Sequence, residues 1–308
     1  MISIIITALN ERKLYLDKTL ESLIPTLKEN DEIIVIDDCS DIPIVIDNKN
    51  IKLERNIFRL GVAQSRHIGA TFAKNKWLLF TDAHVYFKSD WRENFIKYQE
   101  NSNENTIYNG ACLGLWEDSF DYDNLNLDKL PNYYGARLSL YEEKENQILE
   151  GKWIDEKKNI DNYNISCLMG AIYFIQRKFF FKIRGLSDLR MWGSDEPLLS
   201  IKTLLCGGEI KQLKNIKAAH VFRGNAPYST YIKHLLYNKI RMIGTLLPDE
   251  LSNKLLQKLS QNKDLNEAFQ LINNESKIIQ EYKNYYKSIF TENIYDICKK
   301  YNISIDHI

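Results

Sequence analysis

Asp82 and His84 stand two residues apart, directly after the apolar run KWLLFT at residues 76–81. A carboxylate and an imidazole are ligand types that suit manganese and later divalent metals. If the backbone turns there, Ala83 points away and both polar side chains face the same side. A solvated turn after a strand fits the same three letters. The triplet is therefore a candidate metal site, with a plain turn as the alternative.

A second candidate is a carboxylate pair, Asp195 and Glu196, which lies just after Trp192 and opens a predicted helix over residues 196–206. Acidic residues at a helix N-terminus often serve only as caps that complement the helix dipole. They can also supply a general base or hold substrate hydroxyl groups. Trp192 could stack on a sugar ring, and core packing is an equally compatible interpretation.

A third group follows a strand-like run near residue 220. His220 could complete a metal triad with Asp82 and His84, although a lone histidine is more often structural. The planar guanidinium of Arg223 suits pairing with a phosphate. Pro227 marks a turn or loop, as in a lid that closes over a ligand.

Alternating strand-like and helix-like segments would position these side chains. Residues 2–7, 32–36 and 76–81 are short apolar runs, typical of buried parallel strands. Apolar residues at helical spacing over residues 16–27 and 62–74 predict helices between them. This alternation predicts an α/β fold with a parallel, doubly wound sheet, in which ligands bind beyond the carboxyl ends of the strands.

Polar clusters follow all three predicted strands and should converge on one crevice. The clusters are Thr7-Ala8-Leu9-Asn10-Glu11, Asp37-Asp38 and Asp82-Ala83-His84. Arg66 would project from the second helix toward the same crevice. The sequence has neither a G-x-G-x-x-G loop nor a Walker loop, which removes the main support for a dinucleotide oxidoreductase or a P-loop protein.

The remaining segments are less regular. Residues 101–164 are polar and rich in Asn and Tyr, and we expect loops and antiparallel strands that cover a site rather than build the central sheet. Residues 164–176 predict one core strand, and His220 is expected to follow a strand. The chain is mostly helical from residue 228, with an amphipathic patch around Leu236 and Ile240. That patch could pack on the rest of the chain, bind an acceptor substrate or mediate formation of a homodimer.

The composition narrows the class of protein. Lys and Arg together number 41, as do Asp and Glu, so no global field attracts nucleic acid, which is an improbable partner. The five cysteines are scattered and never spaced as C-x-x-C, which argues against a disulfide framework or a zinc ribbon. Neither a signal peptide nor an integral membrane segment is evident, so a cytoplasmic location is expected.

Taken together, these segments resemble the glycosyltransferases of the GT-A fold, and specifically family 2. That family carries a T-x-x-N-E-like turn, a V-D-D-x-S strand end, a G-x-x-x-x-R-N-x-G helix and a D-x-D metal motif. The corresponding segments here are residues 7–11, 36–40, 61–69 and 82–84. His67 replaces the usual Asn, and His84 replaces the second Asp.

The D-x-H form of the metal motif is similar to that of the polypeptide N-acetylgalactosaminyltransferases. Those enzymes then carry W-G-G-E-N, C-G-G, and H-V-F-R with P-Y just after. The matching segments here, in the same order, are Trp192-Gly193-Ser194-Asp195-Glu196, Cys206-Gly207-Gly208, His220-Val221-Phe222-Arg223 and Pro227-Tyr228. The resemblance covers roughly residues 1–245 and leaves the C-terminal helices outside it.

The resemblance implies an α/β fold of GT-A type, with a Rossmann-like, mostly parallel sheet flanked by helices and a C-terminal helical extension. It also implies three parts. Residues 1–105 form the nucleotide-sugar-binding half, residues 106–228 the acceptor and catalytic half, and residues 229–308 the helical extension.

The resemblance also assigns roles by position. Asp82, His84 and His220 would bind a metal ion, manganese or magnesium. The UDP-sugar donor would contact a larger set, namely Thr7, Asn10, Glu11, Asp38, Arg66, Asp82, Trp192, Arg223 and Tyr228. Asp195 and Glu196 would face the sugar and the acceptor as catalytic residues.

The reaction implied is transfer of a hexose or N-acetylhexosamine from a UDP-sugar to a hydroxyl or thiol of a peptide, protein or glycan. Family 2 enzymes invert the anomeric centre with a carboxylate base, whereas the galactosaminyltransferases retain it and have Asn at that position. Because Glu196 stands there, we expect inversion with Glu196 as base. The alternatives are an acceptor on modified DNA bases or a lipid-linked glycan, a nucleotide-sugar-binding protein without turnover, and a metal-dependent hydrolase.

Overall fold

The computed structural model of the protein describes residues 1–99, 102–117, 125–143, 147–154, 162–225, 228–260, 262 and 264–305. Its strands are β1 (Ile2–Ala8), β2 (Glu32–Asp37), β3 (Ile51–Arg55), β4 (Trp77–Asp82), β5 (Val85–Phe87), β6 (Thr106–Trp116), β7 (Asn132–Tyr133), β8 (Ala136–Glu142), β9 (Gln147–Trp153), β10 (Tyr163–Asn164), β11 (Ile172–Gln176) and β12 (Glu209–Phe222). Its helices are α1 (Lys13–Leu23), α2 (Val62–Phe72), α3 (Trp91–Gln99), α4 (Arg177–Lys182), α5 (Asp195–Leu205), α6 (Ile232–Leu246), α7 (Asp249–Leu259), α8 (Leu265–Asn274), α9 (Ser276–Ile289) and α10 (Ile294–Tyr301), with 3₁₀ turns η1 (Ile24–Thr26) and η3 (Leu127–Lys129).

One large mixed sheet organises the chain, in the strand order β10-β12-β6-β11-β4-β1-β2-β3. Strands β3, β2, β1 and β4 are parallel, which confirms the strand-helix alternation expected for the first hundred residues. Strand β11 runs antiparallel to both β4 and β6, and β12 is parallel to β6. The carboxyl ends of β1 and β4 therefore lie side by side, with Thr7 in register with Asp82.

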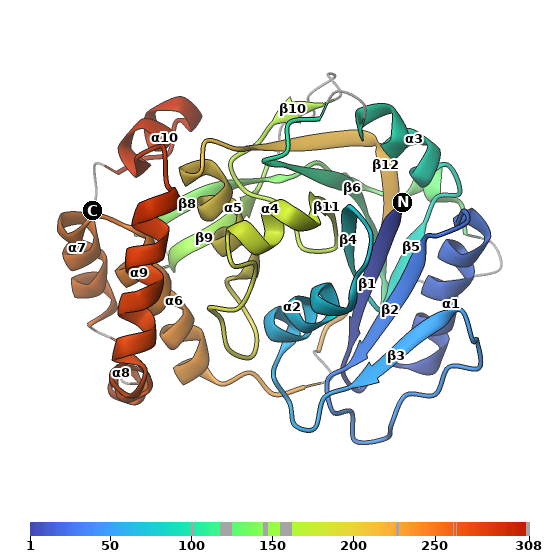
Figure 1. Cartoon of the computed structure of the whole chain (residues 1–308), viewed down its shortest axis with the longest axis horizontal. Coiled ribbons are helices and arrows are strands. Elements are labelled where there is room, and N and C mark those ends of the chain that lie inside the picture. Colours follow the sequence, from blue (N-terminus) through green and yellow to red (C-terminus); the bar gives the residue numbers. More distant parts are fainter. Residues whose placement is uncertain are drawn as a thin grey trace.

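Helices cover both faces of this sheet because the side chains of each strand alternate between two cores. On β4, Leu78 and Phe80 join the core that includes α2, α4 and α5, whereas Trp77 and Leu79 join the core that includes α1 and α3. Every one of these side chains is at most 2% exposed. Figure 1 shows α2 and α4 on one side of β1 and β4, with α1 and α3 on the other side.

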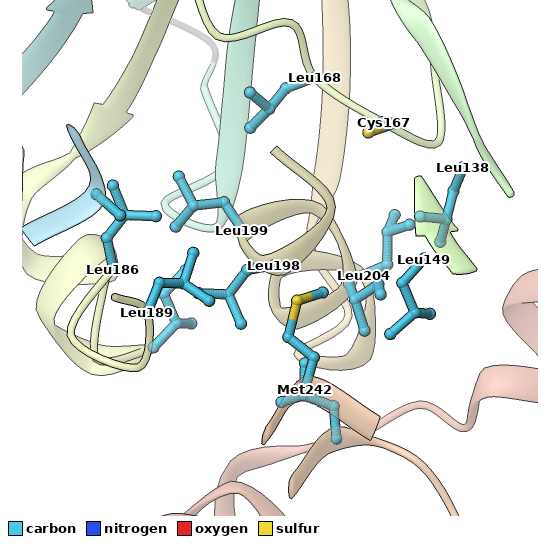
Figure 2. Close-up of a cluster of buried hydrophobic side chains, with 14 of the residues drawn as sticks. Leu138, Leu149, Cys167, Leu168, Leu186, Leu189, Leu198, Leu199, Leu204 and Met242 are labelled. Atoms are coloured by element: carbon cyan, nitrogen blue, oxygen red, sulfur yellow. The ribbon is translucent and has the colours of Figure 1, made fainter. Parts of the chain in front are cut away.

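The C-terminal helices gather at the end of the molecule opposite β1, β2 and β3 (Figure 1). Leu236 and Ile240 on α6 are each 5% exposed and belong to the same core as α2 and α5. Figure 2 shows Met242 of α6 beneath α5, beside Leu198 and Leu204. Packing within one chain thus accounts for the amphipathic patch on α6. Within the described residues, no helix is both long and apolar enough to cross a membrane.

Three sequence-based expectations were wrong in detail. Residues 101–164 do contribute to the central sheet, because β6 is almost wholly buried between β11 and β12. The single core strand expected at residues 164–176 is divided: Asn164 ends β10, β11 begins at Ile172, and a turn at Gly170 lies between them. His220 lies inside β12 rather than after it, paired with Val85 of β5.

Candidate functional site

A pocket of about 680 Å³ opens at the carboxyl ends of the central strands. This volume suits a small-molecule ligand or cofactor. Its walls come from the strand ends, from the segment before α5 and from the end of β12. The lining residues that the sequence had singled out are Thr7, Glu11, Asp38, Arg66, Asp82, His84, Trp192, Asp195, Glu196, His220, Arg223 and Tyr228. The convergence of the three polar strand ends is therefore confirmed.

Asp82, His84 and His220 form a cluster in this pocket, and their candidate ligand atoms all lie within 4.8 Å of one another. Asp82 is the last residue of β4. His220 lies on β12, which pairs with β5, the strand that begins directly after His84. The rings of His84 and His220 have centroids 4.7 Å apart, and Nε2 of His220 is 3.5 Å from Oδ2 of Asp82. One carboxylate and two imidazoles form a donor set that fits Mn²⁺.

The charges around Asp82 favour its ionised form. Burial alone would raise the pKa of this carboxyl, but Arg66, His220 and His84 outweigh burial and hold the pKa well below its ordinary value. Burial lowers the pKa of His220, so its ring is neutral near neutral pH. A carboxylate and a neutral imidazole are the protonation states that a metal ion requires.

Glu11 lines the pocket beside His84, although its side chain is only 4% exposed. One carboxylate oxygen is 2.9 Å from Nδ1 of His84, and the other accepts a hydrogen bond from Arg223. A carboxylate on one ring nitrogen fixes a histidine so that the other nitrogen, here Nε2, can bind metal. These contacts would support His84, and the expected contact of Glu11 with the UDP-sugar donor stays a prediction.

Arg66 is buried, and its guanidinium bridges two carboxylates. It donates to Oδ1 of Asp82 at 2.6 Å and also to Asp195 on α5. The same group donates to the backbone carbonyl of Gly170 at 2.9 Å. Since α2 carries Arg66 into the sheet crevice, this one side chain connects the metal cluster with the start of α5.

Asp195 and Glu196 occupy the first turn of α5, where the helix dipole favours negative charge. Burial and the neighbouring charge of Asp195 raise the pKa of Glu196, and Arg66 offsets this only in part. A carboxylate with a raised pKa is the better proton acceptor near neutral pH. Gly170 leaves the space that Glu196 fills, because a Cβ at that position would overlap its carboxylate oxygen.

Asp38, which directly follows β2, is held in place by hydrogen bonds from backbone amides. Asp38 accepts hydrogen bonds from the amides of Leu60 and Gly61 at 2.9 Å and 2.8 Å. Asn10 donates from its side chain to Asp41 and accepts from the amide of Asp41. Asp38 borders the pocket, whereas Asn10 is not among the described residues that line it. Asn10 instead shapes the neighbouring loop.

Sequence reasoning missed several residues at this site. Arg59 and Tyr231 line the pocket, and Gly170 supports both Arg66 and Glu196. Arg59 stands two residues before Gly61, the glycine that precedes α2, and this position could have indicated that Arg59 lies near the site. Nothing in the sequence around Gly170 pointed to a role. Pro227, expected in a lid, lies outside the described residues.

Comparison with known sequences identifies a family. The model of the family described as "Glycosyl transferase family 2" matches residues 3–184, more than half of the chain. A polypeptide N-acetylgalactosaminyltransferase 3 of Drosophila melanogaster is 26% identical over 242 residues, which cover 74% of this chain and 36% of the relative. An uncharacterized glycosyltransferase of Haemophilus influenzae is 34% identical over 126 residues, 40% of this chain and 42% of the relative. The chain thus spans less than half of these relatives' lengths.

Solved structures share the fold. A crystal structure of GalNAc-T7 with UDP, GalNAc and Mn²⁺ has a TM-score of 0.67 at 21% identity, and covers 98% of this chain and 58% of that one. Staphylococcus aureus TarS 1-349 in complex with UDP-GlcNAc has a TM-score of 0.53 at 14% identity, and covers 89% of this chain and 74% of that one. The fold is therefore that of the GT-A glycosyltransferases.

Proposed function

The chain belongs to glycosyl transferase family 2, and on that premise we propose that it transfers a hexose or N-acetylhexosamine from a UDP-sugar to an acceptor hydroxyl or thiol. The observation that carries this proposal is the cluster of Asp82, His84 and His220 in the same pocket as Glu196. Two solved structures with this fold were crystallised with UDP or a UDP-sugar, which supports the choice of donor.

The UDP-sugar donor would occupy this pocket. Asp38 and Thr7 border the side formed by β1 and β2, and are proposed to face the uridine. Trp192 and Tyr228 border the opposite side and are proposed to contact the sugar and the diphosphate. Arg223 is the cation proposed to pair with the leaving diphosphate, for which a planar guanidinium is well suited.

Asp82, His84 and His220 would hold the metal ion, Mn²⁺ or Mg²⁺. When bound, such an ion stabilises the negative charge that develops on the departing diphosphate. Glu11 would keep His84 oriented, and Arg66 would keep Asp82 ionised and in place.

Glu196 is proposed as the general base of an inverting reaction. It would take the proton of the acceptor hydroxyl as that oxygen bonds to the anomeric carbon and the bond to UDP breaks. Its raised pKa supports this role, because a carboxylate with a higher pKa is the stronger proton acceptor. Asp195 pairs with Arg66 and is proposed to position rather than to take the proton.

The acceptor is proposed to be a peptide, protein or glycan, and the site of action the cytoplasm. All five cysteines, which lie within the described residues, are free thiols, as expected in a reducing compartment. A homodimer through the C-terminal helices stays a prediction.

Incubation with a panel of UDP-hexoses and UDP-N-acetylhexosamines, with peptide and glycan acceptors and Mn²⁺, tests the proposal. Mass spectrometry should find an acceptor heavier by one sugar, and NMR should find that sugar in the β configuration when the donor is α. Binding of a donor without any release of UDP would instead indicate a binding protein. An α-linked product would overturn the inverting role of Glu196 while leaving the transferase assignment intact.

A further inference from the structure

Asn238 of α6 is a buried polar side chain that no step of the proposed reaction uses. We infer that it is a positioning residue, which fixes the segment before α5 that carries Trp192 into the pocket and leads into Asp195 and Glu196. This inference rests on the proposed function, and it makes the C-terminal helices part of the machinery for transfer rather than an appendage.

The contacts of Asn238 are directed entirely at that segment. Its side chain is 0% exposed. Its Oδ1 accepts a hydrogen bond from the amide of Arg190 at 2.8 Å, while Nδ2 donates to the carbonyls of Arg190 and Gly193 at 2.9 Å and 3.0 Å. An amide side chain offers both acceptor and donors, so it can replace the strand or helix partners that this backbone lacks.

The segment needs such a support because its backbone is unusual. Met191, Gly193 and Ser194 all have positive φ angles, of 53°, 97° and 74°. Residues other than glycine adopt this region at an energetic cost, and they remain there only where the surroundings hold them. This conformation turns Trp192 outward, 47% exposed at the pocket, and ends where α5 begins.

Helix α2 and the residues just before it hold the segment from the other side. The amide of Met191 donates to the carbonyl of Leu60 at 2.9 Å, and Gly61 packs so closely on Met191 that it leaves no room for a Cβ. Gln64 donates to the carbonyls of Ser187 and Leu189. Figure 2 shows Leu189 beside Leu198 of α5. With Asn238 removed, the backbone of the segment would lose its hydrogen bonds to α6, while these contacts and the ion pair of the Arg190 side chain with Glu275 would remain.

Binding of Mn²⁺ at Asp82, His84 and His220 provides an internal control for testing this role. Asp82 and His220 lie on β4 and β12, whereas the side-chain hydrogen bonds of Asn238 within the described residues go to Arg190 and Gly193. Loss of positioning should therefore reduce turnover without weakening the binding of Mn²⁺. A general loss of folding would reduce both together.

The experiment compares wild type with Asn238→Ala and with Asn238→Asp, which has the same shape and keeps the acceptor but loses both N–H donors. Thr245→Ala is the matched control, since Thr245 is also buried on α6 and, within the described part of the chain, its hydroxyl donates to the carbonyl of Arg241 in its own helix. The readouts are UDP release from a UDP-N-acetylhexosamine, Mn²⁺ affinity by calorimetry, and hydrogen exchange at the amides of residues 187–196.

Both Asn238 variants should lose roughly 10- to 100-fold in kcat, as expected for a misplaced catalytic group, with Mn²⁺ affinity within about twofold of wild type. Amides 187–196 should exchange faster in both, but not in Thr245→Ala. Unchanged exchange in that segment, or a kcat no lower than in Thr245→Ala, would overturn the inference. If wild type releases no UDP, the proposed function fails and the exchange measurement alone decides whether Asn238 holds the segment. If Asn238→Ala does not fold, the isosteric Asp variant decides.

Discussion

Glu11 is the residue whose position changes the interpretation of the site most. It contacts both His84 and Arg223, so one carboxylate would orient a proposed metal ligand and restrain the cation proposed for the diphosphate. Two functions that act on the same leaving group are thereby coupled through a single buried side chain.

We predict that Glu11→Gln lowers the affinity for Mn²⁺ by about 10- to 100-fold, because His84 loses the carboxylate that orients its ring. Calorimetric titration of Mn²⁺ in the absence of donor measures this directly. Glu21→Gln is a suitable control, since Glu21 is exposed and its ion pair among the described residues is with Lys18 on the surface of α1. Unaltered Mn²⁺ binding in Glu11→Gln would show that His84 needs no such support.

Gly170 offers a second test at this scale. Gly170→Ala would place a methyl group where the carboxylate of Glu196 lies, so Glu196 must move. Displacement of a base by about 1 Å can reduce kcat by roughly 100-fold, and Mn²⁺ affinity should be unchanged. Gly244→Ala on α6 is the control, because a Cβ there meets nothing within 4 Å. Wild-type turnover in Gly170→Ala would argue against Glu196 as the base.

At the scale of elements, α2 is the helix that positions Arg66, and its distance from the sheet is set by Gly69. A Cβ at Gly69 would lie 2.5 Å from Cγ2 of Ile5 on β1 and 3.3 Å from Cγ1 of Ile36 on β2. The helix can therefore approach the strands closely enough for Arg66 to reach Asp82.

Gly69→Ala should lower the free energy of unfolding by about 1–3 kcal/mol, as overpacking of a core typically does. Urea unfolding measures the loss. Thr71→Ala, at an exposed position of the same helix, should stay within about 0.5 kcal/mol of wild type. Stability equal to wild type in Gly69→Ala would mean that α2 can shift away from β1 without cost.

The elements also show what sequence patterns can and cannot predict. Short continuous apolar runs predicted β1, β2 and β4 almost to the residue, because parallel strands buried on both faces have a strong local signal. The central position of β6 was not predictable, since its place depends on pairing with β11 and β12 from distant parts of the chain. Such non-local pairing leaves no mark in a local pattern.

The residues of the site were likewise predictable where the signal is local. His84 and His220 were predictable as candidates from their motifs, and the convergence of the strand ends followed from the α/β pattern. The support that Asn238 gives to the segment before α5 was hidden, because 45 residues separate it from Gly193. Contacts of that kind exist only once the chain is folded.

At the scale of the whole molecule, a charged network joins the C-terminal helices to the segment before α5. Glu275, between α8 and α9, accepts hydrogen bonds from Arg190, Tyr237 and Arg241. Burial would raise the pKa of Glu275, but the bond from Tyr237 and the charges of Arg190 and Arg241 outweigh it and lower the pKa from its ordinary value of 4.5.

A carboxylate whose pKa is lowered by folding contributes stability above its unfolded value, and that stability is lost as the pH falls through the folded value. We therefore predict that Glu275→Gln lowers the free energy of unfolding by about 1–3 kcal/mol at neutral pH, and that its loss of stability below pH 4.5 is shallower than that of wild type. Urea unfolding across this pH range checks both. Glu281→Gln, exposed on α9, should follow the wild-type curve.

The central claim, that a metal ion held by Asp82, His84 and His220 drives transfer from a UDP-sugar, is tested most directly by one measurement. This is UDP release from a UDP-N-acetylhexosamine, followed with Mn²⁺, with EDTA, and with Mn²⁺ restored, in wild type and in His84→Ala. We predict release that stops with EDTA, returns with Mn²⁺ and is largely absent from His84→Ala. UDP release that ignores EDTA, or wild-type release in His84→Ala, would contradict the claim.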